Sequence, residues 1–142
     1  MTRRSALLLV LLIVSCGQVA TPGGPGGPAA TASPSLSPAV SAHGAITLRT
    51  PAVNAKVTSP VTISGDASVF EANVQWRITD TGGRVIAAGF TTASQGAPGR
   101  GAYSIDATYT VTTDTLAFIE VYSRSPKDGT IDESVRIPVT LR

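Results

Sequence analysis

The sequence has one cysteine and one histidine, Cys16 and His43, and this scarcity excludes several classes of protein. A disulfide within the chain needs two cysteines, and a structural zinc site needs four ligands, almost always cysteine or histidine. A general base must be held within hydrogen-bond reach of its substrate, and we expect nothing to hold His43 at the end of a glycine-rich and proline-rich stretch. The composition therefore indicates no disulfide scaffold and no zinc site, and we expect no cofactor and no enzymatic activity.

Long apolar runs and an excess of charge of one sign are also missing. The apolar stretch at residues 6–14 has nine residues, whereas a membrane-spanning helix needs roughly 20. Because Arg3 and Arg4 precede it, the stretch is typical of a secretory signal peptide. Its removal leaves 11 − 2 = 9 basic side chains against 9 acidic ones. The mature chain is formally neutral, so the charge does not indicate a nucleic-acid partner.

Cys16 follows directly on this signal. Residues 13–16 read Ile-Val-Ser-Cys and resemble the bacterial lipobox, in which aliphatic and small residues precede a cysteine that becomes the first residue of the mature protein. The resemblance implies a diacylglyceryl thioether on the Cys16 sulfur and often a third chain, such as palmitate, on the freed amine. Two or more acyl chains give stable anchoring. We expect an exported protein anchored in the cell membrane or an outer membrane, facing the periplasm or the exterior; the alternative is an unprocessed thiol.

The next stretch, up to residue 44, is rich in glycine, proline and serine and poor in large apolar side chains. Such a stretch cannot bury enough surface to offset the entropy of ordering it. The predicted organisation is a lipoprotein signal peptide at residues 1–15, a lipidated cysteine with a disordered tether at 16–44, and one domain at 45–142.

Residues 45–142 match the roughly 100 residues of an immunoglobulin-like sandwich, and short β-rich runs recur in them between turn signals. Val74, Trp76 and Ile78 alternate with polar residues, so we expect Trp76 to anchor the core. Pro138 indicates that the last run is an edge strand. The sequence predicts an all-β, immunoglobulin-like antiparallel β-sandwich of about seven strands, at residues 45–50, 61–65, 73–79, 84–91, 102–109, 115–123 and 134–141.

Several short motifs in this region resemble the immunoglobulin-like domain of bacterial spore germination, which is often attached to a GerMN domain or found alone in exported lipoproteins. The resemblance spans residues 45–142 and implies a sandwich fold, export, and a binding or scaffolding role without catalytic residues. This chain departs from the pattern in having no accompanying GerMN domain and in carrying Pro126 before Lys127. The motifs are Ser59-Pro60, Ser64-Gly65, Val69-Phe70-Glu71, and Lys127-Asp128-Gly129 after Ser123 or Ser125.

In such a sandwich the loop after the second main strand and the loop before the last one emerge at the same end. We therefore expect a partner-binding set of loop residues there, formed by Asp66, Phe70, Glu71, Arg124, Lys127 and Asp128. In the alternative interpretation Asp128 starts a turn, Glu71 pairs with Lys127 or Arg124, and Phe70 caps the core. A calcium site is a further alternative, built from Asp66, Asp128, Asp132 and Glu133, although their spacing is not that of an EF-hand.

The sequence thus indicates a non-catalytic binding or scaffolding module, with the membrane as one partner through its lipid anchor and an envelope protein as the other. Two alternatives remain. A module that binds cell wall or carbohydrate would need exposed aromatic side chains, and a self-assembling subunit would need free edge strands.

Overall fold

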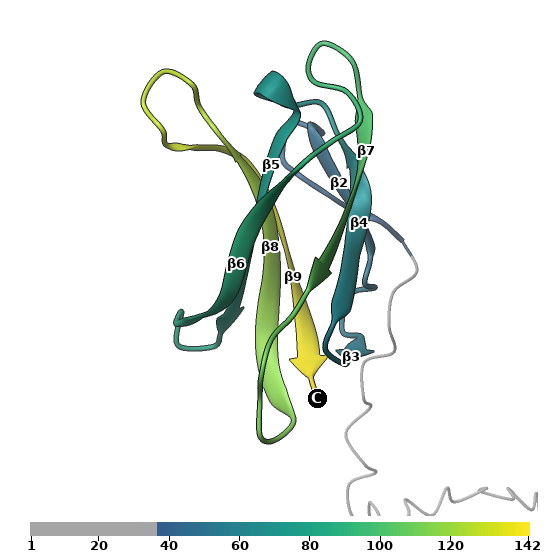
Figure 1. The fold of residues 1–142 in the computed structure, drawn as a ribbon, viewed down its shortest axis with the longest axis vertical. Coiled ribbons are helices and arrows are strands. Elements are labelled where there is room, and N and C mark those ends of the chain that lie inside the picture. The colour runs from purple at the N-terminus through teal and green to yellow at the C-terminus, as the bar shows by residue number, and fades with distance from the viewer. Residues whose placement is uncertain (1–36) are drawn as a thin grey trace, which may run out of the picture. The chain divides into compact units, whose positions relative to one another are not determined.

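A computed structural model describes residues 37–142, in which two β-sheets pack face to face (Figure 1). The predicted signal peptide, Cys16 and the first part of the predicted tether lie outside these residues. One sheet has the strand order β1-β2-β4-β7 and the other β3-β9-β8-β5-β6. The elements are β1 (Ala39–Val40), β2 (Ile46–Thr50), β3 (Lys56–Val57), β4 (Val61–Ala67), the 3-10 helix η1 (Phe70–Ala72), β5 (Asn73–Asp80), β6 (Val85–Thr92), β7 (Gly101–Ala107), β8 (Thr115–Arg124) and β9 (Ile131–Leu141).

This architecture confirms the predicted all-β, immunoglobulin-like sandwich, and each of the seven predicted strands is present. Two strands were not predicted, β1 and β3, which have 2 residues each. Two residues are too few to show the alternation by which a strand is recognised in a sequence. Among the described residues, no helix is long and apolar enough to cross a membrane.

The core lies between the sheets and is built from the alternate positions of the strands. In β5, Val74, Trp76 and Ile78 point inward and are at most 9% exposed. Trp76 packs against Gly89 of β6, where an added Cβ atom would lie 3.0 Å from the indole ring. The prediction that Trp76 anchors the core is confirmed, because its ring fills the space that the missing glycine side chain leaves.

Pro138 lies on the strand β9, which is an edge strand along most of its length. Only the last residues of β9 have a second partner, since β3 pairs with Thr140 and Leu141 in parallel. The carbonyl of Pro138 accepts a hydrogen bond from the Asn54 N–H at 2.8 Å. The proline ring therefore occupies the side of β9 where a ladder of hydrogen bonds is not required, as the sequence predicts.

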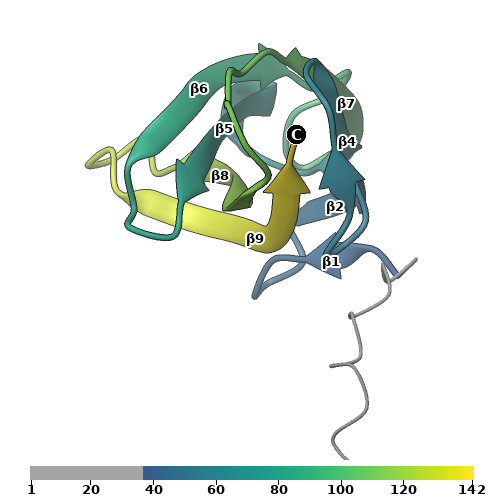
Figure 2. The same cartoon turned by 90° about the horizontal axis from the view of Figure 1, so that it is seen from below.

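The strand β1 precedes the predicted start of the domain at residue 45 and already belongs to the four-stranded sheet. Ala39 pairs with Leu48, and Val40 with Thr47. The Ser41 hydroxyl accepts a hydrogen bond from the Ile46 N–H at 2.9 Å and so closes the turn between β1 and β2. Viewed from below, this turn region lies beside β9, where the two sheets meet (Figure 2). Hydrogen bonds of the turn hold this segment in place. Because the segment has few apolar residues, its sequence does not indicate that it belongs to the sheet.

Candidate functional site

A hollow of about 220 Å³ opens at one end of the sandwich, between η1 and the loop that joins β8 to β9. Its walls combine one aromatic ring, two charged groups and two amides with the start of the β8–β9 loop. The lining residues are Phe70, Glu71, Asn73, Gln75, Arg124, Ser125 and Pro126. Three of the six predicted loop residues, Phe70, Glu71 and Arg124, are thus brought together here.

The backbone of η1 holds Phe70 in an exposed position. Glu71 and Ala72 have φ values of 52° and 56°, in the left-handed region that non-glycine residues rarely adopt. Each such residue costs on the order of 1 kcal/mol and persists only where the surrounding structure enforces it. Here the Ala93 N–H donates to the Ala72 carbonyl at 2.9 Å. The Phe70 side chain is 55% exposed, so it stands at the rim of the hollow and does not cap the core.

Arg124 forms the opposite wall of the hollow and is fixed by three contacts. Its Nε donates to Oε1 of Gln75 at 3.1 Å, and its Nη1 donates to the carbonyl of Gly129 at 2.7 Å. Its guanidinium carbon lies 5.4 Å from the centre of the Tyr122 ring. None of these partners is a carboxylate, so the guanidinium keeps its net positive charge and is held in place for a ligand.

Lys127 and Asp128 form the turn between β8 and β9. The Asp128 carboxylate accepts hydrogen bonds from the Thr130 N–H and hydroxyl at 3.1 and 2.8 Å, and these bonds lower the pKa of Asp128. The Lys127 N–H donates to the Ser125 hydroxyl at 3.2 Å. Among the described residues Glu71 forms no ion pair with Lys127 or Arg124. Asp128 therefore has the turn role that the alternative interpretation gave it, whereas the predicted pairing of Glu71 is wrong.

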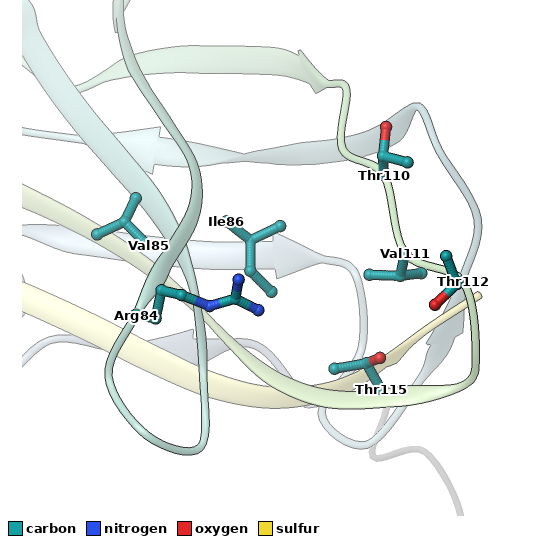
Figure 3. Close-up of a pocket in the computed structure, with 7 residues that line it drawn as sticks. All are labelled: Arg84, Val85, Ile86, Thr110, Val111, Thr112 and Thr115. Atoms are coloured by element: carbon teal, nitrogen blue, oxygen red, sulfur yellow. The ribbon is translucent and has the colours of Figure 1, made fainter.

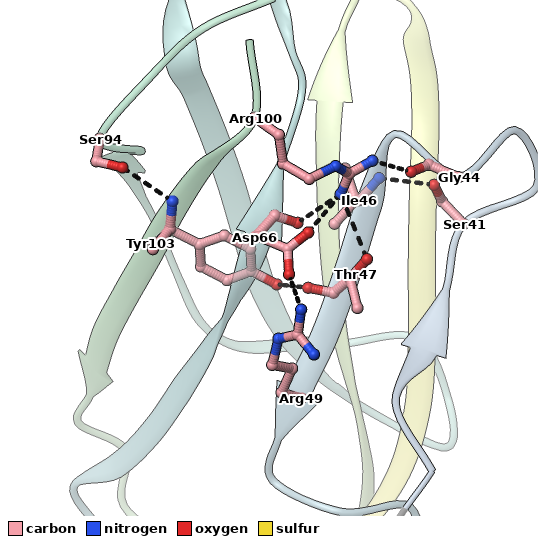
Figure 4. A network of polar contacts seen from close by, with 10 residues as sticks. Ser41, Gly44, Ile46, Thr47, Arg49, Asp66, Ser94, Arg100 and Tyr103 are labelled. Carbon is pink, nitrogen blue, oxygen red and sulfur yellow. Dashed lines mark hydrogen bonds and ion pairs between the residues drawn. The ribbon is translucent and has the colours of Figure 1, made fainter.

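Asp66 is not part of this hollow, and its predicted place in the loop set is wrong. It lies on the outer face of the four-stranded sheet, where its carboxylate binds Arg49 and also accepts from Arg100 at 2.5 Å (Figure 4). Arg100 in addition donates to the Gly44 carbonyl. Arg100 thus ties the loop before β7 to the β1–β2 turn, and Arg49 ties β2 to β4. Asp66 points away from the β8–β9 loop because it occupies an outward position of β4. The alternation of the sequence does not show that Arg49 and Arg100 lie beside this position.

The same carboxylate makes the stability of the domain depend on pH. Burial alone raises the pKa of Asp66, but the hydrogen bonds and charges of Arg100 and Arg49 outweigh it, so this pKa lies below its usual value. A carboxyl group with a depressed pKa in the folded state stabilises the fold above its unfolded pKa of about 3.9, and the contribution is lost as the pH falls through the folded value.

We expect Asp66→Asn to lower the free energy of unfolding by about 1 kcal/mol at pH 7, because two partly exposed charge pairs are lost. The difference from the wild type should shrink below about pH 4, where the wild-type carboxylate is itself protonated. Urea titrations at pH 7 and pH 3 measure both values. Asp106→Asn on the same face is the control, since Asp106 accepts from the Thr62 hydroxyl at 2.9 Å and pairs with no cation in the described part of the chain. A difference for Asp66→Asn that stays constant with pH would contradict this account.

The prediction that nothing holds His43 is wrong. Its ring Nδ1 contacts the carboxylate of Glu133, and its backbone N–H lies 3.3 Å from the same group. Burial alone raises the pKa of Glu133, but hydrogen bonds from Ser41 and His43 outweigh it and lower that pKa. The pair fixes the β1–β2 turn to β9. Among the described residues no three His, Cys, Asp or Glu side chains come together to hold a metal ion, so Asp66, Asp128, Asp132 and Glu133 do not form the alternative calcium site.

A second hollow of about 320 Å³ lies at the other end of the sandwich, between the start of β6 and the loop before β8. Figure 3 shows Arg84 and Ile86 on one side and Val111 and Thr115 on the other. Arg84 is bound to Asp80 at 3.0 Å. The charge of this arginine is thus neutralised, and the hollow offers a ligand mainly threonine hydroxyls and aliphatic groups.

The outer face of the five-stranded sheet carries a set of residues that the sequence reasoning did not single out. We call this set the arginine–aromatic face. Period-two alternation, which placed Val74, Trp76 and Ile78 inside, would have placed the residues between them outside. The arginine–aromatic face consists of Gln75, Arg77, Phe90, Phe118, Glu120, Tyr122, Arg124 and Arg136.

Comparison with known proteins agrees with the observed fold. The family model described as the immunoglobulin-like domain of bacterial spore germination matches residues 45–130. Neither the search of curated proteins nor that of solved structures finds a match. The matched residues include η1, the arginine–aromatic face up to β8 and the start of the β8–β9 loop, and they end before β9 begins.

Proposed function

The chain belongs to the immunoglobulin-like domain family of bacterial spore germination, and we propose on that basis that it is a non-catalytic binding module that works from a lipid-anchored position in the cell envelope. Its contact with a partner is made at the end of the sandwich that carries Phe70. The observation that carries the proposal is the exposed Phe70 ring, set at the rim of a hollow by two left-handed residues.

The placement of the phenylalanine favours binding. An aromatic side chain that is 55% exposed offers apolar area to a partner. Because Glu71 and Ala72 are held in strained left-handed conformations in the folded domain, the Phe70 ring is already oriented before a partner binds. Ordering a side chain in advance reduces the entropy that association must lose.

The buried and partly buried acidic groups support a role other than catalysis. Asp66, Glu120 and Glu133 are each held by a basic side chain, at Arg49 and Arg100, at Arg77, and at His43 respectively. A carboxylate held in an ion pair is kept ionised and oriented by the structure. These acids therefore have structural work that accounts for their burial.

The lipid anchor supplies the position from which the module works. The lipobox-like residues 13–16 indicate acylation at Cys16, and each buried methylene contributes about 0.8 kcal/mol to membrane binding. A domain fixed to a membrane meets other envelope components at a raised effective concentration. A modest affinity at the Phe70 end is then sufficient for a stable association.

Affinity capture tests the binding proposal. The full chain with a tag after residue 142 is immobilised and exposed to detergent-solubilised envelope that includes cell-wall fragments. We expect one envelope protein to be retained, and Phe70→Ser to weaken its binding by about 2 kcal/mol, roughly thirtyfold. Val40→Ser is the matched control, since Val40 is 56% exposed and lies on β1 of the other sheet.

Two results would overturn the proposal. Equal retention of the protein by the Phe70→Ser variant and the wild type would remove Phe70 from the contact. Retention of wall glycan in place of a protein would favour the carbohydrate-binding alternative.

A further inference from the structure

The two outer faces of the sandwich differ in their chemistry. The face of the four-stranded sheet carries small polar groups such as Thr62, Ser64 and Ser104, and its arginines Arg49 and Arg100 are paired with Asp66. The face of the five-stranded sheet carries aromatic rings and guanidinium groups, and Phe90 is 72% exposed whereas Tyr122 is 6% exposed. An exposed apolar or aromatic patch on one face of a domain marks a site of interaction.

Cation–π contacts order the arginine–aromatic face. Arg77 lies 5.3 Å from the centre of the Tyr122 ring, on the side away from Arg124 along the strands. Arg136 lies 4.0 Å from the centre of the Phe118 ring. Stacking on a ring restricts each side chain, and the N–H groups that Arg77 and Arg124 do not already donate to Glu120, Gln75 and Gly129 can reach an acceptor.

The arginine–aromatic face carries uncompensated positive charge. Its one acidic residue, Glu120, accepts from Arg77 at 2.6 Å. Arg124 and Arg136 have no carboxylate partner among residues 37–142, and the sequence has no aspartate or glutamate before residue 66. The charge complementarity of this face therefore points to an acidic partner.

The strand β6 borders this face and has an unpaired edge. In the described part of the chain β6 pairs with β5 alone. Its sequence, VIAAGFTT, has no charge and no proline, although these are the usual protections of an edge strand. Phe90 in this strand is 72% exposed. Free main-chain groups beside an exposed aromatic ring are what an added strand requires.

We propose that the arginine–aromatic face and the edge of β6 together bind an extended, acidic segment of an envelope protein. The segment adds to β6 as a strand, and alternate acidic side chains reach over Ala88 towards Arg77, which is the neighbour of Ala88 in the register. Because side chains alternate along a strand, a partner with acids at every second position directs all of them onto this face.

The composition of the face favours this partner over others. Aromatic residues and arginine are enriched in protein interfaces and lysine is depleted, and β5, β6, β8 and β9 contain no lysine. A second copy of the chain fits poorly. Pairing two β6 strands would place the arginines of both copies on one continuous face, where the acid Glu120 is already paired with Arg77.

The inference rests on the proposed function as a binding module, and the test uses a different part of the surface. A phage library of random linear twelve-residue peptides is panned against the detergent-solubilised full chain. We expect the enriched peptides to carry Asp or Glu at alternate positions and to bind Arg77→Gln at least tenfold more weakly than the wild type, because Arg77 is the arginine next to β6 and its loss leaves Glu120 unpaired. Peptides in which Lys replaces the acidic residues should bind the variant more strongly than the wild type.

Controls separate this inference from the contact at Phe70. Arg142→Glu changes the same residue type next to the end of β9 and should leave binding unchanged. Binding of the peptides to Phe70→Ser should also be unchanged, so a failure at Phe70 and a failure here are distinguishable. N-methylation of alternate peptide amides should weaken binding at least tenfold, because it blocks the ladder with β6.

The inference is overturned if no peptide is enriched, if the enriched peptides show no acidic bias, or if Arg77→Gln binds them as well as the wild type does. Inorganic polyphosphate is added as a competitor. If it displaces the peptides and N-methylation has no effect, the face binds a polyanion and not a strand.

Discussion

Replacing Gly65 with alanine is expected to destabilise the domain by about 3 kcal/mol or more, which is a large part of the stability of a small domain. Gly65 lies in β4, opposite Leu48 of β2 and Tyr103 of β7. A Cβ atom on Gly65 would lie 1.8 Å from the Thr47 carbonyl oxygen and 2.8 Å from the Tyr103 hydroxyl oxygen. Relief of the first contact needs a movement of the β2 backbone, since the atom met is part of the main chain.

The clash would also break a buried hydrogen bond. The Tyr103 hydroxyl donates to the Thr47 carbonyl at 3.0 Å, and burial raises the pKa of this phenol well above its usual value. An added methyl group at Gly65 separates these groups and leaves a polar atom without its partner, which costs a further ~1–3 kcal/mol. The expected loss is therefore larger than that of an ordinary surface substitution.

Urea denaturation of the two proteins measures this effect, with Gly82→Ala as the control. A Cβ atom on Gly82 would meet only the Asp80 carboxylate oxygen, at 3.3 Å, and this side-chain end can move. We expect Gly82→Ala to change the free energy of unfolding by less than about 1 kcal/mol. A Gly65→Ala protein as stable as the wild type would show that β2 and β4 are not as close as described.

The strands were predictable because their signal is local. Alternation of apolar and polar residues places Trp76 inside and Arg77 outside without knowledge of any other strand. In the sequence, Gly65 stands out only as part of a family motif, since its close approach to Thr47 depends on the pairing of β2 with β4. A glycine required by the packing of a distant segment looks the same in a sequence as one in a turn.

The candidate site was predicted in part, for the same reason. Phe70, Glu71 and Arg124 lie at one end of the sandwich because the order of the strands alone brings their loops together. Asp66 and His43 were misplaced because their partners, Arg100 and Glu133, are 34 and 90 residues away in the sequence. Arg136 was missed because an arginine on an outward position of a strand is ordinary until the ring of Phe118 is seen beneath it.

The second large effect is expected at Cys16, on which the proposed membrane position of the module depends. We predict that Cys16→Ser abolishes acylation and moves the protein from the membrane fraction to the soluble fraction, because a serine offers no thiol for the thioether. Two or more acyl chains, each methylene contributing about 0.8 kcal/mol, are then lost together. The loss should be complete, whereas Phe70→Ser and Arg77→Gln leave the anchor intact and act only on the contact with a partner.

The most direct test of anchoring at Cys16 is therefore to label bacterial cells that express and export the protein with radioactive palmitate. Membrane and soluble fractions are then separated. The wild type and the control Ser15→Ala, which keeps a small residue before the cysteine, should be labelled and membrane-bound. Cys16→Ser should be unlabelled and soluble. Equal labelling of Cys16→Ser, or an unlabelled wild type, would contradict the claim that this domain binds its partner from a lipid anchor.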